Sequence, residues 1–298
     1  MRAYHAAPIV GNLLDTRLVV SIGRMVEDLE LNPGTGSIVF SDHAASSGGS
    51  IRVFYFRPPP TRTDPPVVIA MHGFDRAASD FGNVWLEPAG RLGLFVLVPV
   101  FDVEAFPDAH SYNYGNVRRP PPDNALNPRN FWNFGIIDRL FAKVKAATRS
   151  SRECFLMFGN SAGAQYALRY LALTEAPFVR MAIAANSGWY MLPDFAFDYS
   201  TGMGGLDIEE NSLHRYLQRN IVVLLGDTDT DVDLARNEEA MAQGPHRFAR
   251  GLWHFDHCRT VAERLAVPFH WRLEILHAAG HVEQILFDRS ANLLAAES

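Results

Sequence analysis

The amino-acid sequence predicts an α/β fold with a mostly parallel, doubly wound sheet and helices on both faces. Apolar runs of strand length alternate with segments of helical pattern from residue 66 onward. The runs are continuously apolar, as expected for parallel strands that are buried on both faces. No internal repeat, heptad pattern or long linker divides the 298 residues. We therefore expect one domain that covers residues 1–298.

The expected elements follow in order from the N-terminus. In the N-terminal segment, 1–60, β-rich runs at 36–40 and 50–56 flank a Ser-Ser-Gly-Gly turn, which predicts two antiparallel strands. The later strands are expected at residues 66–71, 94–99, 154–158, 181–185, 220–225 and 271–276. Helices are expected at residues 76–91, 130–148, 162–174, 234–250, 255–266 and 282–295, with irregular insertions at 102–129 and 187–212. The insertion at 187–212 is lid-like and too short for a large cap domain, so the cleft should be open.

Composition and charge exclude several classes of protein. Hydrophobic residues make up 48% of the chain, enough for a large core, and the formal net charge is −6 with no basic run, so nucleic acid is not an expected partner. Lys143 and Lys145 are the only lysines, and neither stands in the Gly-Lys-Ser/Thr loop of a nucleotide hydrolase. The longest apolar stretch, 94–101, is shorter than the roughly 20 residues that cross a bilayer, so no membrane span is expected.

Two features bear on the compartment. Residues 1–11 lack the charged and apolar pattern of a secretory signal. The two cysteines, Cys154 and Cys258, are too few for a disulfide framework and are expected to be reduced core thiols. We therefore expect a cytoplasmic protein, and the sequence does not indicate its oligomeric state.

A candidate nucleophile lies between an expected strand and an expected helix. The run Gly159-Asn160-Ser161-Ala162-Gly163 directly follows the apolar run 154–158. A Gly-x-Ser-x-Gly sequence in this context forms a sharp turn that holds the serine in a strained conformation with its hydroxyl projecting. The sequence therefore predicts Ser161 as the nucleophile.

A serine hydroxyl is a poor nucleophile near neutral pH, so a base and a supporting acid should lie downstream. His281 follows the last apolar run and three small residues, and we predict it as the base in preference to His277, which is expected to be a packed or hydrogen-bonded core histidine. Four carboxylates follow the run that ends at Gly226. We choose Asp229 as the acid, with Asp227 and Asp231 as alternatives.

The oxyanion that forms in acyl transfer needs preorganised hydrogen-bond donors. Ala162 N–H opens the helix after the nucleophile, and Met71-His72-Gly73-Phe74 ends an early strand where a second amide is expected. Phe74 N–H is the first choice for that amide, with Gly73 as its neighbour. His72 is expected to brace this loop by a hydrogen bond rather than to act in catalysis.

From about residue 50 onward the chain resembles the α/β-hydrolase superfamily. The order Ser161, Asp229, His281, the early His-Gly pair and the Gly-x-Ser-x-Gly turn carry this resemblance. Within the superfamily, the run Met71-His72-Gly73-Phe74-Asp75-Arg76 resembles the polyhydroxybutyrate depolymerase and feruloyl-esterase-like branch. The resemblance implies acyl transfer through a covalent acyl-enzyme, without a metal ion or an organic cofactor.

We therefore predict a serine hydrolase that cleaves a carboxylic ester of a small molecule. The insertion at 187–212 and the earlier one are rich in aromatic residues, which are suited to an apolar substrate pocket. The side chains predicted to bind substrate are Trp189, Tyr190, Phe195 and Trp132. A peptidase or an acyltransferase would use the same three residues, and a non-catalytic binding protein could retain the scaffold alone.

Two metal sites are weaker alternatives. Asp227, Asp229, Asp231, Asp233 and Glu238 match the spacing of a calcium loop, but Val232 stands where such a loop needs glycine and a strand-like run precedes it. His254, Asp256, His257 and Cys258 lie close together, but no second pair at the usual zinc spacing accompanies them. We therefore expect no metal site.

Overall fold

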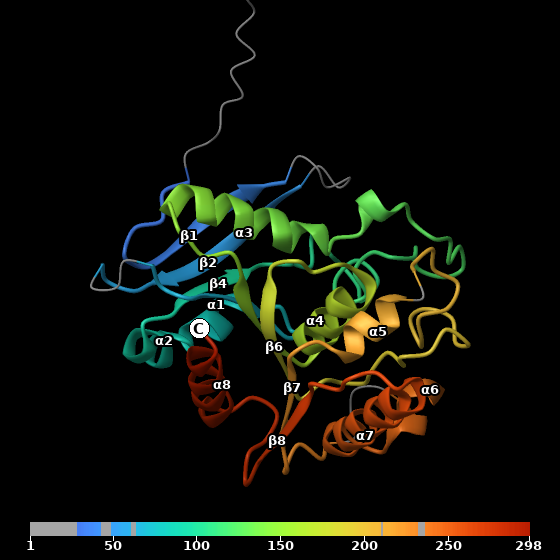
Figure 1. The fold of residues 1–298 in the computed structure, drawn as a ribbon. Coiled ribbons are helices and arrows are strands. Elements are labelled where there is room, and N and C mark those ends of the chain that lie inside the picture. The colour runs from blue at the N-terminus through green and yellow to red at the C-terminus, as the bar shows by residue number, and fades with distance from the viewer. Residues whose placement is uncertain (1–28, 43–48, 61–63, 210, 232–235) are drawn as a thin grey trace, which may run out of the picture.

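The computed structural model describes residues 29–42, 49–60, 64–209, 211–231 and 236–298. These residues form an eight-stranded sheet in the order β1-β2-β4-β3-β5-β6-β7-β8 (Figure 1). The first two strands pair antiparallel to each other and β2 pairs antiparallel to β4, whereas β3 to β8 are parallel. The strands are β1 Gly34–Ser41, β2 Ser50–Arg57, β3 Val67–Met71, β4 Phe95–Pro99, β5 Phe155–Asn160, β6 Val179–Ala185, β7 Ile221–Gly226 and β8 Arg272–Leu276. The predicted fold class is confirmed.

Helices cover both faces of this sheet (Figure 1). On one face α1 Ala78–Asn83, α2 Leu86–Leu92 and α8 Gln284–Ala296 pack on side chains such as Val68 and Ala70. The other face carries Val67, Ile69 and Met71, which pack under α3 Gly135–Thr148, α4 Ala162–Leu173, α5 Asn211–Leu217 and α7 Arg247–Leu265. The short helices η1 Arg129–Phe131 and α6 Glu238–Gln243 complete the described elements. Alternate residues of one strand thus enter opposite cores, which explains why the strands read as unbroken apolar runs.

The structure corrects three expected helices. The helix expected at 76–91 is two short helices, α1 and α2, which are separated at Val84 and Trp85. The break expected between residues 250 and 255 is wrong, because α7 runs unbroken and the preceding helix ends at Gln243, just before Gly244. A Cβ on Gly251 would lie 2.4 Å from Leu225 Cδ2, so this glycine allows α7 to pack closely on β7. The start of the helix expected at 234–250 lies outside the described residues.

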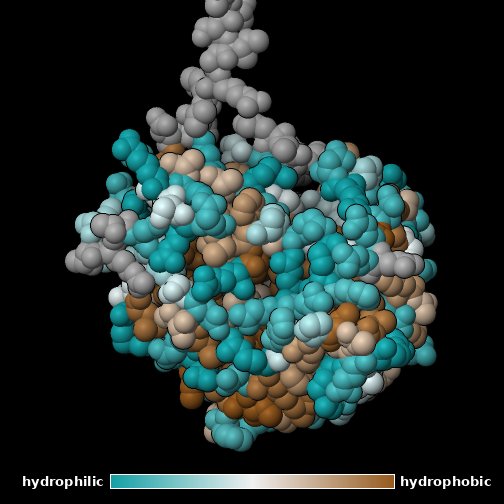
Figure 2. All heavy atoms as spheres, in the orientation of Figure 1, coloured by the Kyte–Doolittle hydropathy of each residue, from teal (hydrophilic) through white to brown (hydrophobic). Residues whose placement is uncertain are grey.

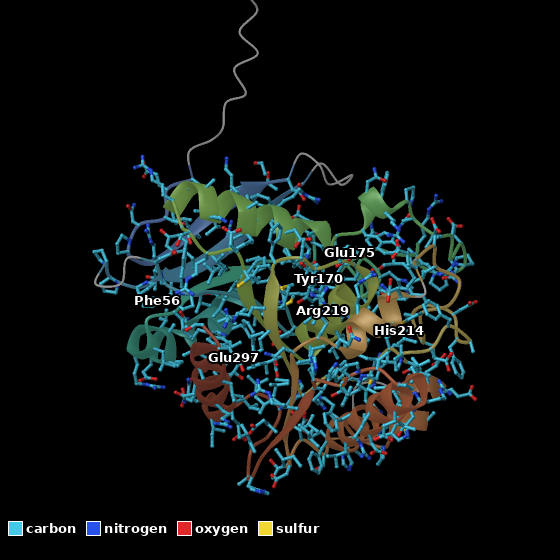
Figure 3. The ribbon with its side chains drawn as sticks, in the orientation of Figure 1. Phe56, Tyr170, Glu175, His214, Arg219 and Glu297 are labelled. Atoms are coloured by element: carbon cyan, nitrogen blue, oxygen red, sulfur yellow. The ribbon has the colours of Figure 1, made fainter. Side chains whose placement is uncertain are left out.

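The C-terminal end of α4 is tied to the loop after α5. Arg219 Nη1 donates to Ala176 O at 3.2 Å, and Nη2 donates to Glu175 O. Tyr170 on α4 donates its hydroxyl hydrogen to Asp138 Oδ1 at 2.5 Å, which joins α4 to α3. Figure 3 labels Tyr170, Glu175 and Arg219 in this region. These contacts fix the helix whose N-terminus follows Ser161.

Polar side chains cover most of the face shown in Figure 2, with apolar patches between them. Within the described ranges, no helix is both long enough and apolar enough to span a membrane.

Candidate active site

Ser161 lies at the sharp turn between β5 and α4. Its backbone has φ 57° and ψ −116°, a strained region for a residue with a side chain, and its N–H donates to Ala185 O at 2.9 Å. A Cβ on Gly159 would lie 2.2 Å from Gly163 O, and a Cβ on Gly163 would lie 2.0 Å from Met71 O. Glycine is therefore required on both sides of Ser161, because the backbone of β3 and of the turn itself fills that space.

His281 and Asp229 are brought together by the loops that follow β8 and β7. His281 Nδ1 lies 2.8 Å from Asp229 Oδ2, and Asp229 is only 2% exposed. His281 and Ser161 border the same cavity, whose volume is about 480 Å³. The Ser161 hydroxyl has no hydrogen-bond partner among the described residues, so a direct bond between Ser161 and His281 stays a prediction.

Asp227, the first alternative acid, makes a separate pair. His277 Nδ1 lies 2.9 Å from Asp227 Oδ2, and Ala278 N–H donates to Asp227 Oδ1 at 2.8 Å. The hydrogen bond with His277 lowers the pKa of Asp227, aided by the Ala278 amide. Since the His277 side chain is 88% exposed, this pair braces the surface of the loop. The second alternative, Asp231, is exposed.

Arg247 is a charged neighbour of Asp229 that the sequence did not indicate. Its Nη1 lies 3.3 Å from Asp229 Oδ1 without hydrogen-bond geometry, and both side chains are almost fully buried. Phe248 N–H donates to Asp229 O at 3.2 Å, so the start of α7 also holds the backbone of Asp229. Arg247 lies 18 residues from Asp229 in the chain, and no spacing rule connects them.

Asn186 is a second residue that sequence reasoning missed. It follows β6, has φ 45° and is fully buried. Its Nδ2 donates to Gly280 O at 3.0 Å and to His281 O at 3.2 Å, and its Oδ1 accepts from Gly226 N–H at 2.9 Å. One side chain thus joins the end of β7 to the loop that carries His281.

His72 braces the loop after β3, as the sequence predicts. Its Nε2 accepts from Phe101 N–H at 3.1 Å, so its Nδ1 carries the proton and donates to Gly73 O at 2.8 Å. Burial lowers the pKa of His72 to about 4, against the weaker opposing effect of the Gly73 hydrogen bond. Tyr112 stacks on the His72 ring and donates to His72 O at 2.7 Å. The loop therefore places Gly73 and Phe74 at the border of the cavity.

The cavity wall differs from the predicted set of aromatic residues. It is lined by Gly73, Phe74, Asp75, Ala77, Asp80, Phe81, Val84, Asn160, Ser161, His281, Val282 and Phe287. Its apolar members come from the α1 and α8 side of the sheet, whereas the prediction looked to the insertions on the other side. Sequence patterns did not indicate which face the cavity would adjoin.

None of the four side chains predicted to bind substrate borders this cavity. Tyr190 stacks on His254 with ring centres 4.3 Å apart, and the Arg169 guanidinium lies 5.2 Å from the Trp189 ring centre. Trp132 donates its indole N–H to Asn127 O at 3.0 Å and borders a different cavity. Phe195 packs partly buried against the core.

The residues of the two alternative metal sites are engaged elsewhere. Asp227 and Asp229 each contact a histidine, a strand rather than a helix precedes them, and Asp233 lies outside the described residues. His254 Nε2 lies 3.4 Å from Cys258 Sγ; burial lowers the pKa of His254 to about 3 and raises that of Cys258. In the described part of the chain, no three His, Cys, Asp or Glu side chains are arranged to hold a metal ion.

No family model and no curated protein matches this sequence. Solved structures do match it. A poly(aspartic acid) hydrolase from Sphingomonas sp. KT-1 is 31% identical over 89% of this chain and 99% of its own, with a TM-score of 0.83. A poly(3-hydroxybutyrate) depolymerase from Bordetella parapertussis is 30% identical over 88% of this chain and 89% of its own, also with a TM-score of 0.83. An S-formylglutathione hydrolase from Agrobacterium tumefaciens is similar in fold. It is 16% identical over 90% of this chain and 97% of its own, with a TM-score of 0.60.

Proposed function

The chain belongs to the α/β-hydrolase superfamily, and from that premise we propose that it is a serine hydrolase that cleaves a carboxylic ester. The observation that carries the proposal is the 2.8 Å contact between His281 and the buried Asp229, at the border of the cavity that also holds Ser161. The two relatives of about 30% identity are named as hydrolase and depolymerase, which supports hydrolase activity. The name of the second relative, a poly(3-hydroxybutyrate) depolymerase, also matches the branch of the superfamily that the Met71–Arg76 run resembles.

In the proposed reaction Ser161 Oγ attacks the acyl carbon of the ester. His281 Nε2 takes the hydroxyl proton, while Nδ1–H remains donated to Asp229 Oδ2. The carbonyl π electrons move to oxygen, and they return as the carbon–oxygen bond to the alcohol breaks and His281 protonates the leaving alcohol. Water then attacks the acyl-Ser161 ester by the same steps, which releases the acid and restores Ser161.

The proposed oxyanion donors are the amides of Ala162 and Phe74, with Gly73 as the neighbour of the second. Ala162 is the first residue of α4, where backbone N–H groups lack helical partners and the helix dipole favours negative charge. Phe74 lies in the loop that His72 and Tyr112 brace. Each donor would lower the barrier by roughly 3 kcal/mol, because its dipole is fixed before charge develops.

The proposal is tested with a fluorophosphonate probe and a short para-nitrophenyl ester. We expect the wild-type protein to be labelled at Ser161 and to turn the ester over, and Ser161→Ala to lose both. Ser37→Ala changes an exposed serine on the edge strand β1 and should retain both. Labelling or turnover that persists in folded Ser161→Ala would reject Ser161 as the nucleophile. A folded wild-type protein that does neither would favour a non-catalytic binding protein.

Amide hydrolysis is a second candidate. It is favoured by the relative of 31% identity, because its named substrate, poly(aspartic acid), is a polymer joined by amide bonds. An ester and an anilide of the same acid separate the two activities, since only the leaving group differs. We expect the enzyme to cleave the ester faster than the anilide, and the ratio of the two enzymatic rates to exceed by far the ratio of the two uncatalysed rates. Formation of a new ester when a second alcohol is added would instead indicate an acyltransferase.

A further inference from the structure

We propose that the cavity beside Ser161 takes a substrate group that is apolar and neutral or cationic, and that Asp75 and Asp80 exclude groups that carry a carboxylate. This inference rests on the proposed function and names the class of substrate for the same site. Its basis is the wall of the cavity, which combines an apolar surface with two carboxylates.

The apolar part of the wall comes from three segments. Phe81 and Val84 lie on and after α1, Val282 and Phe287 lie before and within α8, and Phe74 lies on the loop after β3. Phe74 and Val282 are 52% and 57% exposed, although both are large apolar side chains. A substrate group that enters the cavity would cover this surface and remove it from water, which favours an apolar group.

Asp75 lies next to the nucleophile. A Cβ built on Gly73 would lie 3.2 Å from Asp75 Oδ1 and 3.9 Å from Ser161 Cβ, so the carboxylate and the serine flank the same small space. Ala77 N–H donates to Asp75 Oδ1 at 3.3 Å, which holds the carboxylate in this position. Asp80, in the first turn of α1, borders the cavity as well. Within the described residues, neither carboxylate lies within ion-pair distance of a cation.

Arg76 does not supply the missing positive charge inside the cavity. Its guanidinium lies over the Tyr112 and Phe74 rings, 4.0 and 4.8 Å from their centres, and its Nη2 donates to Phe106 O at 3.0 Å. Asp102 and Asp108 also act on it electrostatically, and Asp75 acts on it more weakly than they do. The described groups that border the cavity therefore carry two negative charges, and a carboxylate on the substrate would be repelled.

The inference separates this protein from one of its relatives. Poly(aspartic acid) carries a carboxylate on every residue, and it is the named substrate of the hydrolase that is 31% identical. A cavity with two carboxylates would disfavour such a polymer. We therefore expect poly(aspartic acid) to be a poor substrate of this chain.

The experiment compares para-nitrophenyl esters of three acids of similar length: hexanoic acid, adipic acid and aminocaproic acid. Adipic acid is esterified at one end only, so its other carboxylate stays free. They carry a neutral, an anionic and a cationic end, and each rate is divided by the rate of hydroxide hydrolysis. A second series carries the same charges on the alcohol half, so the result does not depend on which half fills the cavity. Poly(aspartic acid) is assayed beside them.

In wild type we expect kcat/KM at low ionic strength to be at least about tenfold higher for hexanoate than for the adipate half-ester. The ratio should shrink as salt screens the charges. Asp75→Asn with Asp80→Asn should lower the ratio at least about fivefold, because asparagine keeps the shape and removes the charge. Glu87→Gln on α2, a carboxylate outside the cavity that pairs with Arg91 at 3.2 Å, should leave the ratio as it is.

Equal normalised rates for the neutral and anionic esters in wild type would overturn the proposal, as would rapid cleavage of poly(aspartic acid). A ratio that the double variant does not change would also overturn it. These results differ from a failure of the proposed function, in which no ester is cleaved and the fluorophosphonate does not label Ser161.

Discussion

Arg247 Nη1 lies 3.3 Å from Asp229 Oδ1, the carboxylate oxygen that His281 does not contact. Asp229 is therefore placed between a permanent cation and an imidazole, one on each oxygen. Asp229 is 2% exposed and Arg247 5%, so water screens this pair far less than it screens a surface pair. Burial makes each partner dependent on the other, because an unpaired buried charge is costly.

We expect Arg247→Met to lower the free energy of unfolding by about 3 kcal/mol, because it leaves Asp229 buried without its cation. It should also lower kcat, since an acid that shifts in its pocket no longer fixes the His281 ring. Urea unfolding and ester turnover measure the two effects. Arg259→Met on the same helix removes exposed contacts with Asp256 and Glu263, and should cost less than about 1 kcal/mol. Equal losses in both variants would contradict a special role for Arg247.

The two aspartates after β7 are expected to differ sharply in catalysis. Asp229→Asn keeps the shape of the acid but removes the charge that supports a protonated His281, so kcat should fall by about ten-thousandfold. Asp227→Asn changes a contact with the exposed His277 and should lower kcat by less than about threefold. Steady-state kinetics of the two folded variants checks this. If Asp227→Asn gave the larger loss, the acid would have to be reassigned.

The sequence predicted the strands better than the surroundings of the candidate residues, for a physical reason, and the roles of those residues stay predictions. Ser161 directly follows β5, and Asp229 and His281 lie in the loops after β7 and β8, while parallel strands bring their carboxyl ends to one edge of the sheet. Arg247 and Asn186 act through contacts between segments far apart in the chain, which no local pattern records. The predicted aromatic residues Trp189 and Tyr190 do not border the cavity, because periodicity does not tell which side of a loop faces the core.

Asn186 joins the loop that carries His281 to Gly226 at the end of β7, three residues before Asp229. Asn186→Ala removes the acceptor of the buried Gly226 N–H and the donor to the partly buried Gly280 O and His281 O. We expect the free energy of unfolding to fall by about 2 kcal/mol. We also expect kcat to fall at least about tenfold with little change in KM, since His281 loses its fixed position. Asn237→Ala, on the exposed N-terminus of α6, serves as the control. An unchanged kcat in the Asn186→Ala variant would show that the other contacts of the loop suffice.

His72, the buried histidine of the loop after β3, predicts how stability depends on pH. Burial holds the pKa of His72 at about 4 in the folded protein, against an ordinary value of 6.5. Between these values the unfolded chain binds a proton that the folded chain does not. The stability that neutral His72 contributes is therefore complete above pH 6.5 and is lost as pH falls toward about 4. The expected slope is at most about 1.4 kcal/mol per pH unit.

His254 acts in the same direction, because burial lowers its pKa to about 3. Urea unfolding of wild type between pH 4 and 7 should therefore show a falling free energy on acidification. Replacing His72 with Gln should make that slope shallower by up to about 1.4 kcal/mol per pH unit, whereas His270→Gln, at an exposed site, should not change it. Protonation also removes the Nε2 acceptor of Phe101 N–H, so the loop that carries Phe74 should loosen at the acid end of this range. A His72→Gln protein with the wild-type slope would mean that the imidazole is already charged, or already exposed, in the folded protein.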